Sequence, residues 1–492
     1  MLLALLLLPS LAFAALRAGT GRADITDRDA GPVNDPSYVK ALALDDGATR
    51  AVVITIDVVA LAEIGRLDNG FMARIRAELE RDPGIPARNV IANASHTHSI
   101  IRRDTDKLTV QAVREAWRNL TPVRAGAGRG HEDRISENRR MYLKSGAQAD
   151  MRRAYSMPRD QDVASTGPID PEIGLLRFDR LDGKPLAVVY NFAAHPIMAV
   201  PNGGNTADYP AFASRAIEEN LGDGVLAFFI QGCGGDINPA KYKDTHVPHD
   251  AEPLGNRLGL AALRAVRNIR TRDTASFRLI NETLTIPRAA DFEQRMSAVR
   301  AKLDGLVKSL QGTNLNFKTF LELYVQQKLA PDAPAYYVHR YQHEKAVGLQ
   351  DLAKMDADNR ADVAAYLRNI ETMEEITRLQ TNLALLEKHH AEAAGRKTMD
   401  VEVVGLRIGD FNLVTFPGEL TVEIGLGIKK RARAPFTFVA GYTNGYLYYT
   451  ATAEQRKNSG YAQEDCDVMV APEWQAIFES KAESILGRLA AQ

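Results

Sequence analysis

Apolar segments that alternate with amphipathic segments constrain the fold of this chain more than any other feature of its sequence. Residues 51–57 (AVVITID) are apolar without polar alternation, residues 70–81 have apolar positions at helical spacing, and residues 89–94 (NVIANA) are apolar again. The same order recurs later, with strands predicted at 185–192 and 225–230 and helices at 209–220 and 255–269. Strands of this kind, separated by helices, pack in a sheet that is covered on both faces. We therefore expect an α/β fold with a mostly parallel or mixed sheet covered by helices.

The pattern changes between about residues 290 and 395. This stretch has few strand signals and contains long, charged helical segments such as 291–310 and 362–394. Strand and helix signals then resume, at 399–408, 411–416, 419–431, 436–440 and 474–489. The sequence predicts one large domain over residues 15–492 with a helical insertion at about 290–395.

The first fourteen residues, MLLALLLLPSLAFA, have the composition of a signal peptide. The run is apolar and ends in Ala12-Phe13-Ala14, a pattern that signal peptidase accepts, although no Lys or Arg precedes it. We expect cleavage near Ala14 and a periplasmic or secreted protein, with an uncleaved anchor as the alternative. The cysteines, Cys233 and Cys466, are expected to form either one bridge or two buried thiols.

The charge balance argues against nucleic acid as a partner. The chain has 61 basic and 62 acidic side chains, and the resulting net charge of −1 provides no field that would gather a polyanion. Peripheral membrane contact stays open, and the oligomeric state is not predicted.

Polar motifs follow the predicted strands at their carboxyl ends, where open α/β sheets bind ligands. They are His96 and His98 in ASHTHS, His195 in FAAHP, Asp236 in GCGGDINP, Glu419 in FPGE and the tyrosines of GYTNGYLYY. Two imidazoles at i and i+2 of an extended segment point the same way, and with His195 and Glu419 they provide enough ligands for zinc. By spacing alone, the two histidines fit equally well a structural role in a hydrogen-bonded loop.

Other polar groups have simpler interpretations. His339 and His343 could chelate a metal at i, i+4, but no motif supplies a carboxylate. His389 and His390 are expected on a solvated helix face, and His246 and His249 in a polar loop near the site. The glycine-rich loop at 232–235 could donate its N–H groups to an oxyanion or could simply form a tight turn.

At these segments the chain resembles the neutral ceramidase family, zinc-dependent amidases that hydrolyse N-acylsphingosine. The resemblance extends from GRADIT at 21–26 to the last helix and is weakest in the helical stretch. Four ordered motifs carry it: SHTHS at 95–99, NFAAHP at 191–196, PGEL at 417–420 and NGYLYY at 444–449.

The resemblance implies roles for individual residues. It assigns the zinc ligands to His96, His195, Glu419 and Tyr449. Tyr446 and Tyr448 lie in the same motif as Tyr449 and are alternatives to it. The site residues that it implies beside the metal are His98, Arg139 and Tyr461, and Asn238 stands where the family has its catalytic serine.

Two departures from the family pattern bear on the reaction. Asn238 in GDINP cannot act as a nucleophile, although its amide can donate to an oxyanion. The chain also ends at Gln492, before the immunoglobulin-like C-terminal domain of the characterised ceramidases. Both departures argue against ceramide itself as the substrate.

We therefore expect an exported, zinc-dependent hydrolase that cleaves an amide in an N-acyl lipid or other N-acyl compound. The partner that the resemblance implies is a small-molecule or lipid-like amide. Zinc-bound hydroxide would attack, since zinc lowers the pKa of its water to about 7, and no covalent acyl-enzyme would form. The alternatives are a metal-dependent esterase using the same site and a non-catalytic lipid- or carbohydrate-binding homologue.

Overall fold

An eight-stranded mixed sheet forms the larger half of the body of the molecule. The computed structural model describes residues 15–151, 157–222, 224–273, 277–331, 336–458 and 462–491. The strands of this sheet, in spatial order, are β12 (Leu226–Gln231), β11 (Pro185–Phe192), β10 (Glu172–Arg180), β5 (Thr121–His131), β1 (Arg17–Asp24), β2 (Tyr38–Asp45), β3 (Arg50–Ile56) and β4 (Val90–Ala94). Only β11 with β12 and β3 with β4 pair in parallel. The predicted α/β fold is confirmed, and its sheet is mixed because antiparallel pairs fill the space between these two parallel edges.

The strand β3 shows why its sequence lacks polar alternation. Val52 and Ile54 face one buried cluster, whereas Ala51 and Val53 face another on the opposite side of the sheet. A strand that is buried on both faces must be apolar at every position.

A second, four-stranded sheet packs on the first. Its strands in spatial order are β14 (Phe277–Pro287), β15 (Thr398–Ile408), β16 (Phe411–Thr415) and β18 (Phe436–Ala440). Leu413 and Phe438 of this sheet share a buried cluster with Leu176 and Val189 of the first sheet.

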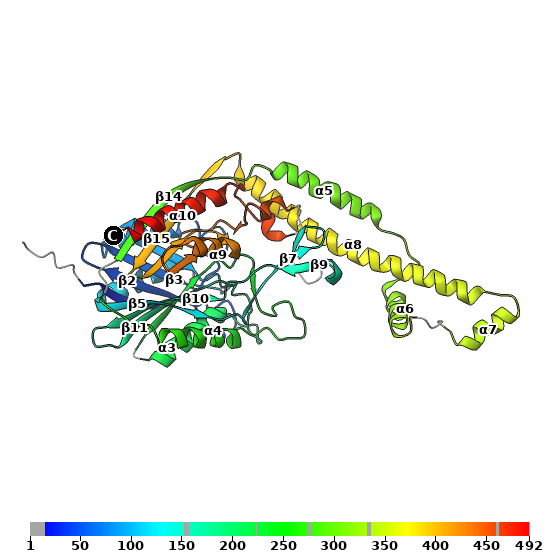
Figure 1. Cartoon of the computed structure of the whole chain (residues 1–492), viewed down its shortest axis with the longest axis horizontal. Coiled ribbons are helices and arrows are strands. Elements are labelled where there is room, and N and C mark those ends of the chain that lie inside the picture. Colours follow the sequence, from blue (N-terminus) through cyan, green and yellow to red (C-terminus); the bar gives the residue numbers. More distant parts are fainter. Residues whose placement is uncertain are drawn as a thin grey trace, which may run out of the picture.

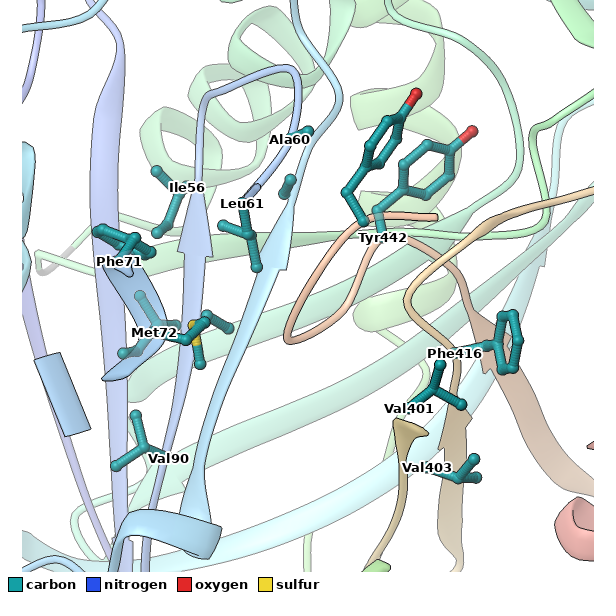
Figure 2. Close-up of a cluster of buried hydrophobic side chains, with 14 of the residues drawn as sticks. Ile56, Ala60, Leu61, Phe71, Met72, Val90, Val401, Val403, Phe416 and Tyr442 are labelled. Carbon is teal, nitrogen blue, oxygen red and sulfur yellow. The ribbon is translucent and has the colours of Figure 1, made fainter. Parts of the chain in front are cut away.

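Helices cover the outer faces of the two sheets (Figure 1). The helices α2 (Thr105–Arg118), α3 (Asp208–Leu221) and α4 (Ala251–Val266) pack on the larger sheet, and α10 (Trp474–Ala490) packs on the smaller one. The shorter helices α1 (Phe71–Arg81) and α9 (Val422–Arg431) lie beside them. Figure 2 shows Ile56 and Phe71 on one side of a buried cluster and Val403 and Phe416 on the other.

Short paired strands, in two pairs and one group of three, lie among the loops beyond the carboxyl ends of the main strands. They comprise β13 (Ile237–Pro239) with β6 (Ser136–Asn138), β17 (Glu419–Leu420) with β19 (Tyr449–Thr450), and β7 (Arg140–Leu143) between β8 (Gln148–Asp150) and β9 (Val163–Thr166). These pairs fix the loops that carry most of the predicted site residues.

The predicted helical insertion is confirmed. It contains α5 (Phe292–Ser309), α6 (Phe317–Leu329), α7 (Val338–Ala346) and α8 (Asp351–Ala393). At 1.5 Å per residue, the 43 residues of α8 correspond to about 65 Å. Figure 1 shows α8 leaving the body, with α6 and α7 at its far end. We call α5 to α8 the arm.

Both cysteines are free and buried, so the bridge is wrong and the two buried thiols are confirmed. Cys233 lies against α9, where a β-carbon on Gly425 would come within 2.6 Å of its sulfur. Cys466 belongs to the cluster between α5 and α8, and burial raises the pKa of its thiol to about 12. Among the described residues, no helix combines the length and apolarity needed to cross a membrane. The predicted signal peptide, residues 1–14, lies outside the described residues.

Candidate functional site

Three strand ends bring His96, His195 and Glu419 together. His96 follows β4, His195 follows β11 and Glu419 begins β17. One ligand atom from each residue lies within 4.8 Å of the others, and all three side chains are buried. The Glu419 Oε2 atom is 3.1 Å from His195 Nε2 and 3.6 Å from His96 Nε2.

Backbone carbonyls orient both imidazoles. The Nδ1–H of His96 donates to the Val59 carbonyl oxygen at 2.6 Å, and the Nδ1–H of His195 donates to that of Gly234 at 2.6 Å. A carbonyl oxygen can only accept, so the proton of each neutral ring is on Nδ1 and the Nε2 lone pair faces Glu419. This arrangement is typical of histidines that bind a metal.

The electrostatics of the cluster suit a cation. Burial lowers the pKa of His96 to about 4 and also lowers the pKa of His195, where nearby Arg139 adds to the effect. Burial works against ionisation of Glu419, but positive charge on His96 or His195 and the hydrogen bond from Tyr446 outweigh it and hold its pKa well below the usual range. At neutral pH two imidazole lone pairs therefore converge on a buried carboxylate, and a bound metal ion would satisfy all three groups together. The donor set fits zinc, which binds neutral imidazole nitrogen and carboxylate oxygen.

Two tyrosine hydroxyls donate to Glu419, and their roles were not predicted. Tyr446 donates to Oε1, and Tyr442 donates to Oε2 at 3.2 Å. The signal was in the sequence, because GYTNGYLYY contains four tyrosines beside the ligand motif. The motif alone could not show which hydroxyl reaches which group.

Left-handed backbone at non-glycine residues is concentrated around this cluster. His96 has φ 67°, and Tyr442, Asn444 and Tyr448 have φ 53°, 60° and 55°. Such conformations cost about 1–3 kcal/mol each and persist where the surroundings fix them. For His96, the N–H group donates to the Val58 carbonyl oxygen, so the neighbouring loop holds both its backbone and its ring.

A cavity of about 760 Å³ opens onto the cluster and is lined by all the described residues that were predicted for the site. His98 is exposed in this cavity, with its ring centroid 5.6 Å from that of His96. Tyr449 pairs with Glu419 between β19 and β17, and its ring centroid lies 6.4 Å from that of His195. Its assignment as a metal ligand stays a prediction. Tyr461 lies outside the described residues.

Arg139 and Asn238 form a buried pair on the cavity wall. The guanidinium of Arg139 donates to Glu464 at 2.5 Å and to the Gly235 carbonyl oxygen at 2.7 Å, and it lies over the Tyr449 ring. It also donates to Asn238 Oδ1 at 3.4 Å. This contact fixes the amide, and the Nδ2 group of Asn238 is buried without a hydrogen-bond partner among the described residues. An unpaired buried donor that borders a cavity is suited to a ligand's oxygen atom.

In the glycine-rich loop the three glycine N–H groups are already engaged within the protein, which favours the tight turn over an oxyanion hole made by these groups. The N–H groups of Gly232, Gly234 and Gly235 donate to backbone carbonyls, and the Gly234 carbonyl orients His195. A β-carbon at Gly235 would lie 2.5 Å from the Glu419 carbonyl oxygen, so this glycine permits the close approach of the two segments. Asp236 is structural, since it accepts from the Val422 N–H group at 2.8 Å.

The arm reaches the cavity through one residue of its lining. Lys388 of α8 lines the cavity and donates to the Tyr448 hydroxyl at 2.9 Å. The next residue, His389, was expected on a solvated face, and that expectation is wrong. His389 is buried because α8 packs on the body there, and it contacts Asp467 Oδ1 at 2.6 Å. His390 is about half exposed, as expected.

The remaining histidines do not join the cluster. His339 and His343 are exposed on α7, and within the described part of the chain the only group of three metal-binding side chains is His96, His195 and Glu419. His249 stacks on Tyr242, which lines the cavity, but neither His249 nor His246 lines it.

Comparison with solved structures identifies the fold. The chain is similar to neutral ceramidase from Pseudomonas aeruginosa, with a TM-score of 0.59 and 18% identity over 97% of this chain and 76% of that one. A ceramidase complexed with C2 matches with a TM-score of 0.60 and 18% identity over 97% of this chain and 75% of that one. No family model matches the chain. The likeness shows a neutral ceramidase-like fold, as the sequence motifs led us to expect.

Proposed function

We propose that this chain is a zinc-dependent hydrolase that cleaves the amide bond of an N-acyl lipid or another N-acyl compound, in the periplasm or outside the cell. The observation that carries the proposal is the buried cluster in which both imidazole Nε2 atoms face the Glu419 carboxylate beside a large cavity. The ceramidase-like fold and the ordered motifs support amide hydrolysis, and the apolar first fourteen residues support export.

His96, His195 and Glu419 would hold the ion, with Tyr449 as a fourth ligand. The bound zinc would supply Lewis acidity and a water of lowered pKa. The carbonyls of Val59 and Gly234 keep the imidazoles oriented, and the Tyr442 and Tyr446 hydroxyls keep the carboxylate in place.

The unpaired Nδ2 group of Asn238 would donate to the substrate carbonyl oxygen as it gains charge. Arg139 holds this amide from behind and is itself fixed by Glu464. An imidazole nitrogen of His98, exposed in the cavity, would carry a proton to the leaving amine, with Tyr461 as a second proton donor.

The test combines metal analysis with matched substrates. The purified full chain is assayed for bound zinc and for hydrolysis of amide and ester pairs that share one acyl group. We expect one zinc per chain, amide hydrolysis that a chelator abolishes and zinc restores, and no acyl adduct by mass spectrometry.

Each contrary outcome has a definite meaning. Zinc binding with ester cleavage alone would favour a metal-dependent esterase. Zinc binding without turnover across the panel would favour a lipid- or carbohydrate-binding homologue. Full activity in metal-free protein would overturn the proposal.

A further inference from the structure

The tip of the arm concentrates exposed apolar side chains. Of the sixteen large hydrophobic side chains exposed in the described part of the chain, ten lie between residues 317 and 355. Only three, at positions 100, 181 and 260, lie in the body. A patch of this kind on a soluble surface usually marks an interaction site.

The helix α6 has apolar residues on two faces, and the arm covers only one of them. Phe320 is buried and stacks on Tyr366 of α8, with ring centroids 4.3 Å apart. A second stripe, at intervals of four residues, is exposed and consists of Phe317, Leu321, Val325 and Leu329. Leu329 is 82% exposed and Phe317 is 64% exposed, so the two ends of this stripe are open to solvent.

The neighbouring helix α7 extends the same kind of surface. Tyr337, 80% exposed, and Val338 lie at its start. Two hydrogen bonds hold α7 to α8, since the Tyr341 hydroxyl donates to Asp356 and the Leu352 N–H group donates to Glu344 at 3.0 Å. The apolar residues are therefore exposed on helices that are anchored to α8.

Cations flank this surface. Lys318, Lys328, Arg340 and Lys345 are exposed, and the described residues offer none of them a carboxylate within ion-pair distance. Lys328 and Arg340 instead lie over the rings of Tyr324 and Tyr336. Of the carboxylates on α6 and α7 and beside them, Glu344 and Asp356 are occupied by the groups that anchor α7, whereas Glu322 of α6 is exposed, so the four cations outnumber the exposed carboxylate of these two helices.

We propose that the tip of the arm, α6 and α7, binds the surface of an anionic lipid bilayer. Exposed aromatic and aliphatic side chains flanked by unpaired Lys and Arg are the composition of segments that lie in a membrane interface. The phosphate-rich surface of an anionic bilayer complements these cations. A second copy of the chain would place the same cations opposite one another, which disfavours self-association through this face.

The experiment measures sedimentation of the full chain with phosphatidylcholine vesicles that contain or lack phosphatidylglycerol, with no substrate present. The tip variant carries Leu321→Gln, Leu329→Gln and Tyr337→Ser. The matched control carries Leu181→Gln and Leu260→Gln, at exposed apolar positions of the body. These positions are exposed, so folding should survive, and circular dichroism checks it.

We expect binding to the anionic vesicles that high salt weakens, a loss of about tenfold or more in the tip variant, and no change in the control. Lys318→Glu with Arg340→Glu should also reduce binding. Equal binding by the tip variant and the wild type would overturn the proposal, and so would binding that does not depend on phosphatidylglycerol. If light scattering showed a dimer for the wild type and a monomer for the tip variant, the surface would be assigned to contact with a second copy of the chain instead. Since no turnover is measured, failure here leaves the proposed hydrolase function standing.

Discussion

The candidate metal cluster and the tip of the arm use tyrosines in opposite ways. In the cluster, Tyr442 and Tyr446 are buried and their hydroxyls donate to one carboxylate. At the tip, Tyr336 and Tyr337 are exposed, and their rings lie against Arg340 and His339 of the same segment. The difference teaches that the surroundings, and not the residue type, decide whether a replacement should alter chemistry, stability or surface properties.

The largest expected effect comes from the cluster. His195→Ala removes one imidazole from a buried carboxylate, so we expect zinc content to fall well below one per chain and kcat/KM to fall by about 10⁴-fold or more. Metal analysis and hydrolysis of the preferred amide measure the two effects. His390→Ala, on the solvated side of α8, is the matched control. If the His195→Ala protein kept its full zinc content and full turnover, the cluster would have no role in the mechanism.

The second prediction contrasts one phenylalanine from each region. Phe416 is fully buried, with ring centroids 4.4 Å from Phe478 and 5.1 Å from Trp474. Phe416→Ala should lower the free energy of unfolding by about 3–5 kcal/mol. Phe317→Ala, at the exposed stripe, should change it by less than about 0.5 kcal/mol. Denaturant titration measures both, and similar losses would mean that the stripe is covered in solution.

The third prediction concerns the unpaired donor. Asn238→Ala should lower kcat by about 10²–10³-fold and leave the zinc content unchanged, because the role proposed for the amide is to contact the substrate and not the ion. Asn220→Ala, exposed on α3, serves as the control. An initial product burst with an acyl adduct on any side chain would show a covalent mechanism and contradict this role.

The smallest expected effect depends on pH. Burial raises the pKa of Asp57 to about 6, although its side chain keeps some contact with solvent. The folded state therefore holds this proton more tightly than the unfolded state, whose pKa is near 4. The contribution of this proton to the free energy of unfolding is fully present below pH 4 and is lost as the pH rises through 6. The upper bound of this contribution is about 3 kcal/mol.

Asn resembles the protonated carboxyl, so Asp57→Asn should gain stability relative to the wild type between pH 4 and 7. Thermal melts across that range measure the difference. Glu322→Gln, on the exposed surface of α6, should leave the pH profile unchanged. A constant difference between wild type and Asp57→Asn would mean that the carboxyl titrates normally.

Much of the fold could be predicted, because its central strands and helices are apolar at regular spacing. The predicted strand at 185–192 coincides with β11, and the predicted helix at 474–489 is α10 to within one residue. β1 and β5 were missed because their sequences are rich in glycine. A β-carbon at Gly19 would lie 2.1 Å from the Ala116 carbonyl oxygen, and one at Gly126 would lie 2.6 Å from that of Arg270. Close packing of neighbouring backbone therefore removes the side chains that would have indicated a strand.

The site could be predicted in part for a similar reason. His96, His195 and Glu419 each follow a strand that was identified correctly, so their convergence could be expected. The contacts of Tyr442 and Tyr446 depend on a loop with left-handed residues, which no periodic pattern indicates. The burial of His389 depends on where α8 meets Asp467, a contact between residues 78 positions apart.

The continuity of α8 links the two regions mechanically. Lys388 lies at the cavity and Asp351 at the tip, and their separation of 37 positions along the helix corresponds to about 55 Å. A rigid rod of this length acts as a lever, so a tilt of about 5° at the cavity end displaces the far end by about 5 Å. If a surface held the tip in place, Lys388 at the cavity could therefore move less. A ligand whose binding displaced Lys388 would then have to shift the tip against the free energy that holds it on that surface.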